Sequence, residues 1–100
     1  MEVELFQAEV FKALAHPTRL QILGRLRERR CCVSELAEAL ERSHANISQH
    51  LTTLRQANLV LAEKEGQRVW YIVMDERLFR VVELVTEIII DHTRYVEEAF

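Results

Sequence analysis

The chain has 100 residues, of which 49% are hydrophobic, and its formal net charge is −3 at pH 7. This length suffices for one small domain over residues 1–100, and burial between two copies would enlarge a core of that size. The first residues alternate glutamates with apolar side chains, unlike a signal peptide, and no apolar run is long enough to span a bilayer. We therefore expect a soluble, cytoplasmic homodimer without a membrane partner.

The negative net charge argues against a nucleic-acid partner, but the charge is segregated along the chain. Residues 12–30 carry Lys12, Arg19, Arg25, Arg27, Arg29 and Arg30 against the single acid Glu28. Residues 81–100 carry Glu83, Glu87, Asp91, Glu97 and Glu98 against the single base Arg94. Because the N-terminal part of the chain is basic and the C-terminal part is acidic, DNA binding remains possible for the N-terminal part.

Apolar residues at three- and four-residue spacing predict a helix over residues 5–14 and a second helix from Pro17 to about Arg27. Residues 31–33 are expected to form a short extended link. Ser34 and Ser43 are predicted N-caps of two further short helices, because serine at this position accepts a bond from a free backbone N–H.

Residues 59–64 and 68–73 are β-branched or aromatic runs around Gly66, which predicts a hairpin. Asp75 can cap a long last helix. Its apolar stripe comprises Leu78, Val81, Val82, Val85, Ile88, Ile89, Val96 and Ala99. The predicted fold is mainly α with a small β-hairpin, a winged helix-turn-helix, and the long apolar stripe of its last helix calls for a partner.

The fourth predicted helix carries candidate DNA contacts. If Ile47, Leu51 and Leu54 face the core, the helical repeat turns Ala45, Gln49, Thr52 and Gln56 outward and leaves Asn46, Ser48 and Thr53 on the shoulders. None of these is acidic. Asn and Gln can pair with adenine, and Ser and Thr can reach bases or phosphates, so the best candidate base readers are Asn46, Ser48 and Gln49.

Other candidates lie beside that face. His44 is placed to reach phosphate, whereas His50 falls on the buried side and is expected to pack or to contact phosphate. Lys64 and Arg68 flank the hairpin turn and are expected to enter the minor groove or hold the backbone. Each residue taken alone is equally compatible with a solvated surface position. The whole predicted DNA-binding set is His44, Ala45, Asn46, Ser48, Gln49, Thr52, Thr53, Lys64 and Arg68.

Four segments, "FKALAHPTRLQIL", "VSELAEAL", "SHANISQHLTTLRQANLV" and "EGQRVWYIV", closely resemble the ArsR/SmtB family of prokaryotic repressors in order and spacing. The resemblance implies a homodimer on a palindromic operator in double-stranded DNA, released when a metal, metalloid or oxidant alters it. It also implies dimer contacts from the first and last helices, which agrees with the apolar stripes.

Two adjacent cysteines are the candidate effector site. Metalloid-sensing members resemble "ELCVCDL", to which residues 30–36 align: Cys32 keeps one thiol, Ser34 replaces the other, and Cys31 stands where the family has a buried leucine. Arg29, Arg30 and the following helix start are expected to lower the thiol pKa. Three possibilities stay open: binding of a soft ion such as arsenite or cadmium at Cys31 and Cys32, thiol oxidation, or a structural pair.

Zinc-sensing relatives place ligands on the last helix, where Asp75, Arg77, Ile88 and Asp91 align. Both histidine ligands are missing, so no zinc site is expected there. A thiol enzyme is disfavoured because the chain lacks C-x-x-C and any supported catalytic arrangement. A dimeric protein-interaction module without DNA binding is the remaining alternative.

Overall fold

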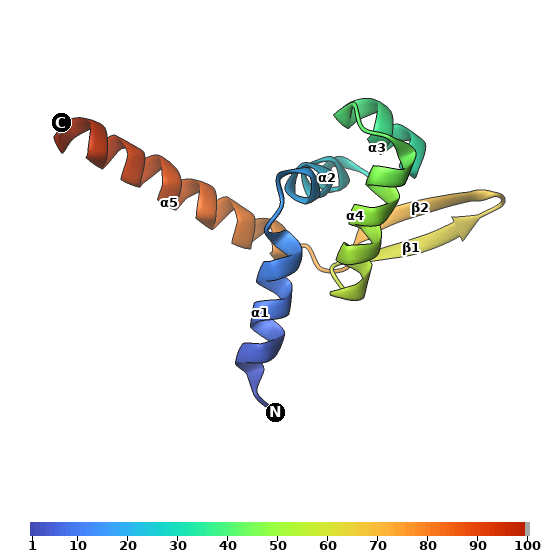
Figure 1. Cartoon of the computed structure of the whole chain (residues 1–100), viewed down its shortest axis with the longest axis horizontal. Coiled ribbons are helices and arrows are strands. Elements are labelled where there is room, and N and C mark those ends of the chain that lie inside the picture. Colours follow the sequence, from blue (N-terminus) through green and yellow to red (C-terminus); the bar gives the residue numbers. More distant parts are fainter. Residues whose placement is uncertain (100) are drawn as a thin grey trace.

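The computed structural model describes residues 1–99, with side chains described through Thr93. The elements in chain order are α1 (Val3–Leu14), α2 (Pro17–Glu28), α3 (Val33–Leu40), α4 (His44–Gln56), β1 (Val60–Glu65), β2 (Arg68–Val73) and α5 (Arg77–Ala99) (Figure 1). The predicted class, helices with one small hairpin, is confirmed. The side chains of Val96 and Ala99, predicted members of the apolar stripe, lie outside the described part.

The core lies where α2, α3 and α4 meet the start of the hairpin. Ile47, Leu51 and Leu54 of α4 are at most 1% exposed, as the helical spacing predicts. They pack in one cluster with apolar side chains from the other elements, including Ile22, Leu23, Leu26, Leu36, Ala37, Val60 and Leu78. This packing fixes which face of α4 is left outward.

Of the two serines predicted to be helix N-caps, Ser43 is an N-cap in the structure and Ser34 is not. Ser43 caps α4, since its Oγ accepts the N–H of Asn46 at 3.0 Å. The prediction that Ser34 caps α3 is wrong, because the helix begins at Val33 and Cys32 is the N-cap. The carboxylate of Glu35 accepts the N–H of Cys32 at 3.1 Å, and this reach back from the third helical residue sets the helix start.

Asp75 caps α5 as expected. Its Oδ1 accepts the N–H of Arg77 at 2.9 Å, and the guanidinium of Arg77 pairs with Oδ2 at 2.7 Å. The bonds from the Arg77 side chain and backbone lower the pKa of Asp75 to about 2. The carboxylate at the helix start is therefore charged at any physiological pH.

The hairpin is antiparallel and pairs Val60 with Val73 and Glu65 with Arg68 across the turn at Gly66. Gly66 has φ of 66°, a left-handed conformation that glycine adopts without strain. An isolated bridge joins Cys31, in the link between α2 and α3, to Tyr71 of β2. The hairpin is thus attached at its base to the helical core and extends beyond it as a wing (Figure 1).

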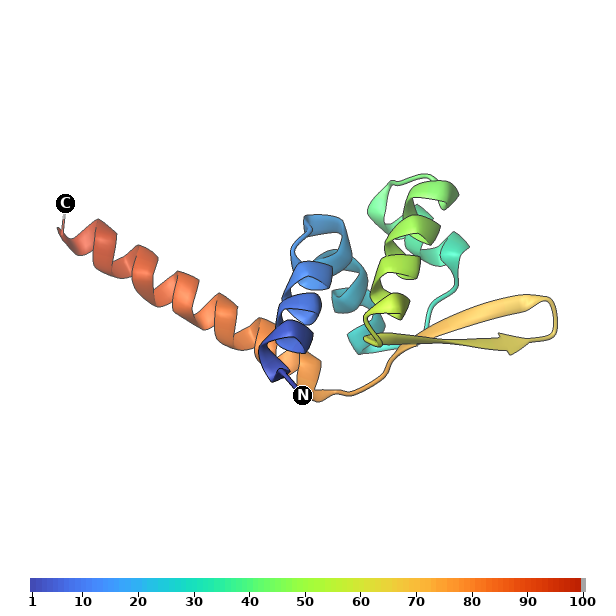
Figure 2. The ribbon, with the colours of Figure 1, turned by 60° about the horizontal axis from the view of Figure 1, so that its bottom comes forward.

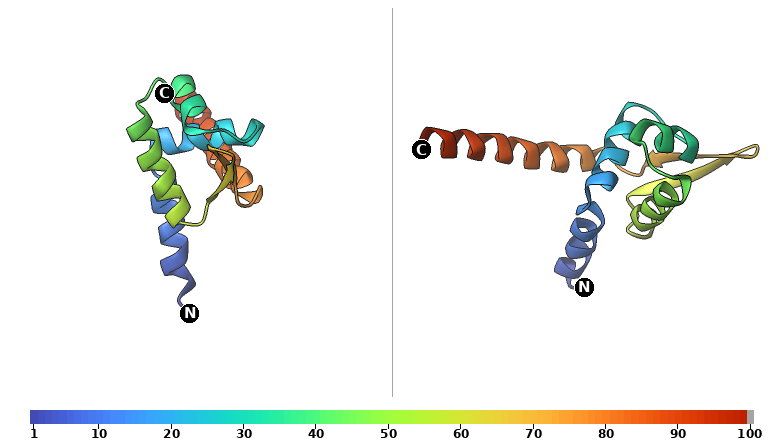
Figure 3. Two further views of the ribbon diagram at one scale, coloured as in Figure 1. Left: turned by 90° about the vertical axis from the view of Figure 1, so that its right-hand side faces the viewer. Right: turned by 45° about the horizontal axis from the view of Figure 1, so that its top comes forward.

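Helices α1 and α5 project from the core in different directions, α5 as a long arm (Figures 2 and 3). The radius of gyration is 15.6 Å, compared with about 13 Å for a compact domain of this length. The projecting helices carry most of the exposed large apolar side chains, namely Val3, Leu5, Phe6 and Phe11 on α1 and Val81, Leu84, Val85, Ile88, Ile89 and Ile90 on α5. Among the described residues, no helix combines the length and the apolar character that a membrane crossing requires.

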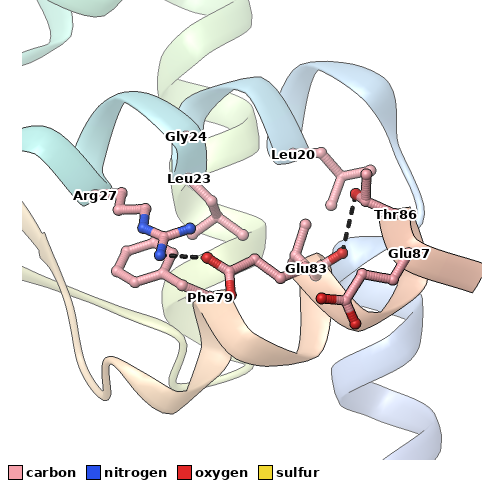
Figure 4. A pocket seen from close by; sticks show the side chains of 9 residues that line it. Leu20, Leu23, Gly24, Arg27, Phe79, Glu83, Thr86 and Glu87 are labelled. Atoms are coloured by element: carbon pink, nitrogen blue, oxygen red, sulfur yellow. Dashed lines mark hydrogen bonds and ion pairs between the residues drawn. The ribbon is translucent and has the colours of Figure 1, made fainter. Parts of the chain in front are cut away.

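A groove lies between α2 and the first turns of α5 (Figure 4). Arg27 closes one end, because its guanidinium forms an ion pair with Glu83 and lies 5.4 Å from the centre of the Phe79 ring. Leu20 of α2 is 39% exposed and lines this groove. Gly24 lines it too, and the absence of a side chain there leaves the groove open.

Candidate nucleic-acid interface

One face of α4 is free of the core and free of acids. We define the recognition face as the exposed α4 residues other than Arg55, namely His44, Ala45, Ser48, Gln49, Thr52 and Gln56. Helix α4 contains no aspartate or glutamate, so nothing on this face repels phosphate. Amide and hydroxyl groups alternate along it, and these groups hydrogen-bond to base edges in a major groove.

Of the three predicted shoulder residues, Ser48 is exposed and belongs to the recognition face, whereas the other two are less accessible. Asn46 and Thr53 are half-buried, and Oδ1 of Asn46 is buried without a hydrogen-bond partner in the described structure. The hydroxyl of Thr53 donates to the Gln49 carbonyl at 3.3 Å, and that of Thr52 donates to the Ser48 carbonyl at 2.9 Å. Both hydroxyls keep lone pairs as acceptors, whereas Asn46 must turn its amide outward to read a base.

His50 is buried, 8% exposed, as its position on the helix predicts. Its Nδ1 lies 3.2 Å from Nη1 of Arg19 in α2. Burial, together with the nearby His16, Arg19 and Arg42, lowers the pKa of His50. A neutral, buried imidazole is a packing group and not a phosphate contact.

The wing carries the remaining predicted contacts, Lys64 and Arg68, and both side chains are exposed. They flank the turn on opposite strands. Two guanidinium groups lie near the ring of Trp70, that of Arg30 at 4.4 Å and that of Arg68 at 5.4 Å from the ring centre. Arg30 also donates to Glu65 at 2.8 Å, so contacts from the α2–α3 link reach the part of the wing beside the turn.

Two exposed arginines at the ends of α4, Arg42 and Arg55, were not predicted from the sequence. Arg42 precedes the helix in the turn from α3, and Arg55 lies in the last turn of α4. They add positive charge at both ends of α4. Their exposure near the recognition face depends on how the chain folds, so the sequence alone does not identify them.

The cysteine pair differs from the sequence-based expectation. Cys31 and Cys32 are both 6% exposed, and Sγ of Cys31 donates to the Arg29 carbonyl at 3.5 Å. Burial and the carboxylate of Glu35 raise the pKa of Cys31, outweighing the opposite effect of Arg29, so the predicted lowering is wrong for this thiol. The charges of both adjacent arginines are engaged by other groups, that of Arg29 by Glu35 and that of Arg30 by Glu65 and the Trp70 ring.

In the part of the chain that the structure describes, no three His, Cys, Asp or Glu side chains come together to hold a metal ion. Glu35, the acid next to the pair, is engaged by the N–H of Cys32 and by Arg29 at 3.2 Å. A soft ion prefers several thiolates, and the protonated, buried Cys31 thiol does not fit that requirement.

Comparison with known proteins agrees with this geometry. Residues 16–61 match the model of the bacterial regulatory protein arsR family. An uncharacterized HTH-type transcriptional regulator of Methanocaldococcus jannaschii is 40% identical over 82 residues, 81% of this chain and 92% of that protein. The HTH-type transcriptional repressor SmtB of Mycobacterium tuberculosis is 40% identical over 74 residues, 74% of this chain and 55% of that protein.

A solved structure extends the similarity to the fold. The homodimeric winged helix-turn-helix DNA-binding domain of a possible ArsR-family transcriptional regulator from Mycobacterium bovis superposes with a TM-score of 0.81. It is 34% identical, and the match covers 90% of this chain and 86% of that one. The chain therefore belongs to the ArsR family of winged helix-turn-helix transcriptional regulators.

Proposed function

We propose that this protein is a homodimeric transcriptional repressor that binds a palindromic operator through α4 and the wing. The observation that carries the proposal is the recognition face, an exposed helical surface without acids beside a wing with Lys64 and Arg68. A helix of this kind fits the major groove, and the wing cations suit the adjacent backbone or minor groove. Repression is proposed after the repressor SmtB, while the equally identical HlyU of Vibrio cholerae is named a transcriptional activator, so a transcription assay decides the direction.

The homodimer is supported by the exposed apolar faces of α1 and α5 and by the homodimeric Mycobacterium bovis neighbour. Ile88 and Ile89 are 66% and 58% exposed in the single chain, which is a large apolar area to leave in water. A second copy related by a two-fold axis would cover it. The two recognition faces would then meet successive major grooves about 34 Å apart.

The central experiment is fluorescence anisotropy with a duplex selected from a random library by the wild-type protein. Gln49→Ala should weaken binding to this duplex by about 1–3 kcal/mol and relax the sequence preference at one base pair of each half-site. Gln21→Ala is the matched control, since Gln21 is an exposed glutamine on α2 away from the recognition face. Equal affinities for the two variants would refute the role of Gln49, and no specific binding at low salt would favour the interaction module.

Dimerisation is tested by sedimentation at fixed concentration. Ile89→Glu should dissociate the dimer, because it places a charge within the apolar face of α5. Arg80→Glu is the control, because position 80 lies on the opposite side of the same helix.

In vitro transcription from a promoter that contains the selected sequence should decrease when the protein is added, and an increase would assign activation in place of repression.

We propose a structural role for the cysteine pair in preference to effector binding or oxidation. The burial of both thiols and the raised pKa of Cys31 support this role. Arsenite, cadmium and peroxide are therefore expected to leave the wild-type DNA complex intact. Release by one of them that is lost in Cys31→Ser or Cys32→Ser would restore the thiol-reactive effector.

A further inference from the structure

The side chain of Arg19 connects three helices. It leaves the first turn of α2, and its Nε donates to the Ala13 carbonyl at 2.6 Å while Nη2 donates to the Lys12 carbonyl at 3.3 Å. These carbonyls belong to the last turn of α1, where a cation is favourable because the backbone carbonyls have no helical partner. The third contact is Nη1 to Nδ1 of His50, at 3.2 Å, on the buried face of α4.

The contact between Arg19 and His50 has a defined donor and a defined acceptor. A guanidinium has only donors, so Nδ1 of His50 accepts and the ring carries its proton on Nε2. The neighbouring His16 is fixed in the same sense, because its Nδ1 accepts the N–H of Thr18 at 3.0 Å and caps α2. The two imidazole rings lie 4.3 Å apart. Both rings thus accept through Nδ1 between the ends of α1 and α2 and the middle of α4.

The position of this contact along α4 relates it to DNA binding. His50 directly follows Gln49 of the recognition face and lies one helical turn from the shoulder residue Asn46. A shift of the helix at His50 therefore moves the recognition face with it, since a helix moves as a rigid rod over one or two turns. Helix α1, at the other end of the contact, carries exposed Phe6 and Phe11 on its apolar face.

We propose that Arg19 is a positioning residue, which sets the orientation of the recognition face relative to α1 through its contact with His50. The inference rests on the proposed function, because it assigns to Arg19 the orientation of the two copies of α4 in the DNA-binding dimer. Arg19 itself is half-buried and touches the α1 carbonyls and His50, so it acts on DNA through α4.

The test is a double-mutant cycle on the affinity for the selected duplex and for a random duplex. Arg19→Gln and His50→Leu should each weaken specific binding on the order of tenfold, and the double variant should lose no more than either single variant. The control Arg25→Gln removes the same charge from an exposed position on α2 and should change both affinities equally. Arg19→Lys should restore part of the specific affinity, since it keeps the donor to the carbonyls.

Unfolding and sedimentation measured on the same variants separate positioning from a general loss of structure. If Arg19→Gln stays folded and dimeric and its ratio of specific to random affinity equals that of Arg25→Gln, the proposal is wrong. Additive losses in the cycle would also overturn it.

Should the wild-type protein bind no duplex specifically, the proposed function fails by itself. Amide chemical shifts then decide about Arg19, because its substitution must shift resonances along residues 44–53, and unchanged shifts there would refute the contact's role.

Discussion

Cys31 and Tyr71 bond to each other twice: the N–H of Cys31 donates to the Tyr71 carbonyl at 3.3 Å, and the N–H of Tyr71 donates back at 2.8 Å. This pair ties the α2–α3 link to the second strand of the wing. It also explains why the Cys31 side chain turns into the core, where it packs among Leu26, Leu36 and other apolar residues.

Replacing Cys31 by serine should therefore lower the free energy of unfolding by about 1–3 kcal/mol, because a hydroxyl is buried where a thiol packed. Urea unfolding followed by circular dichroism measures the change. Ser34→Ala serves as the control and should stay within about 0.5 kcal/mol, since Ser34 is exposed and does not cap α3. A loss near 1 kcal/mol for Ser34→Ala would contradict the assignment of Cys32 as the cap.

Gly24 lies inside α2 with no atom within 4 Å of the position that a Cβ would take. Gly24→Ala should raise the free energy of unfolding by about 0.5–1 kcal/mol, because alanine restricts the unfolded chain and favours the helix. Thermal unfolding should show a rise of about 2–8 °C. Gly66→Ala should do the opposite, since Gly66 has φ of +66°. A lower Tm or weaker dimer for Gly24→Ala would mean that a second copy fills the α2–α5 groove.

The stability of the protein should fall on mild acidification because of His50. Its pKa in the folded state lies below the ordinary value of 6.5, so the unfolded chain takes up the proton first. The stability that the neutral His50 gives the folded state is complete above pH 6.5. It is lost as the pH falls below that value towards the folded-state pKa of His50. Urea unfolding at pH 7.5 and 5.5 measures it. His50→Gln keeps an acceptor without titrating, so an equally steep pH dependence in this variant would contradict the assignment to His50.

Arg30 is expected to control the environment of Trp70, the single tryptophan of the chain. Arg30→Ala removes both the guanidinium over the ring and the pair with Glu65, so the emission of Trp70 should shift to longer wavelength as water reaches the ring. The free energy of unfolding should change by less than about 1 kcal/mol, because the ion pair is exposed. Arg29→Ala, which removes the neighbouring arginine, should leave the emission unchanged, and an equal shift in both would refute the contact.

The sequence by itself determined the succession of helices, the hairpin, the Ser43 cap and the outward side of α4. Each of these follows from local periodicity or from bonds between residues a few positions apart, which the order of amino acids contains directly. Ile47, Leu51 and Leu54 point inward for this reason, and His50 follows them to the buried side.

Only the tertiary structure decided the state of the cysteines and the contacts of the arginines. Charge counted along the chain predicts a lowered thiol pKa at Cys31, yet burial between α2, α3 and β2 raises it, because desolvation depends on segments distant in sequence. Arg19 with His50 and Arg30 with Trp70 are likewise separated by 31 or more positions, and no local pattern pairs them. The recognition face could be predicted from the sequence, whereas the groups that hold it in place could not.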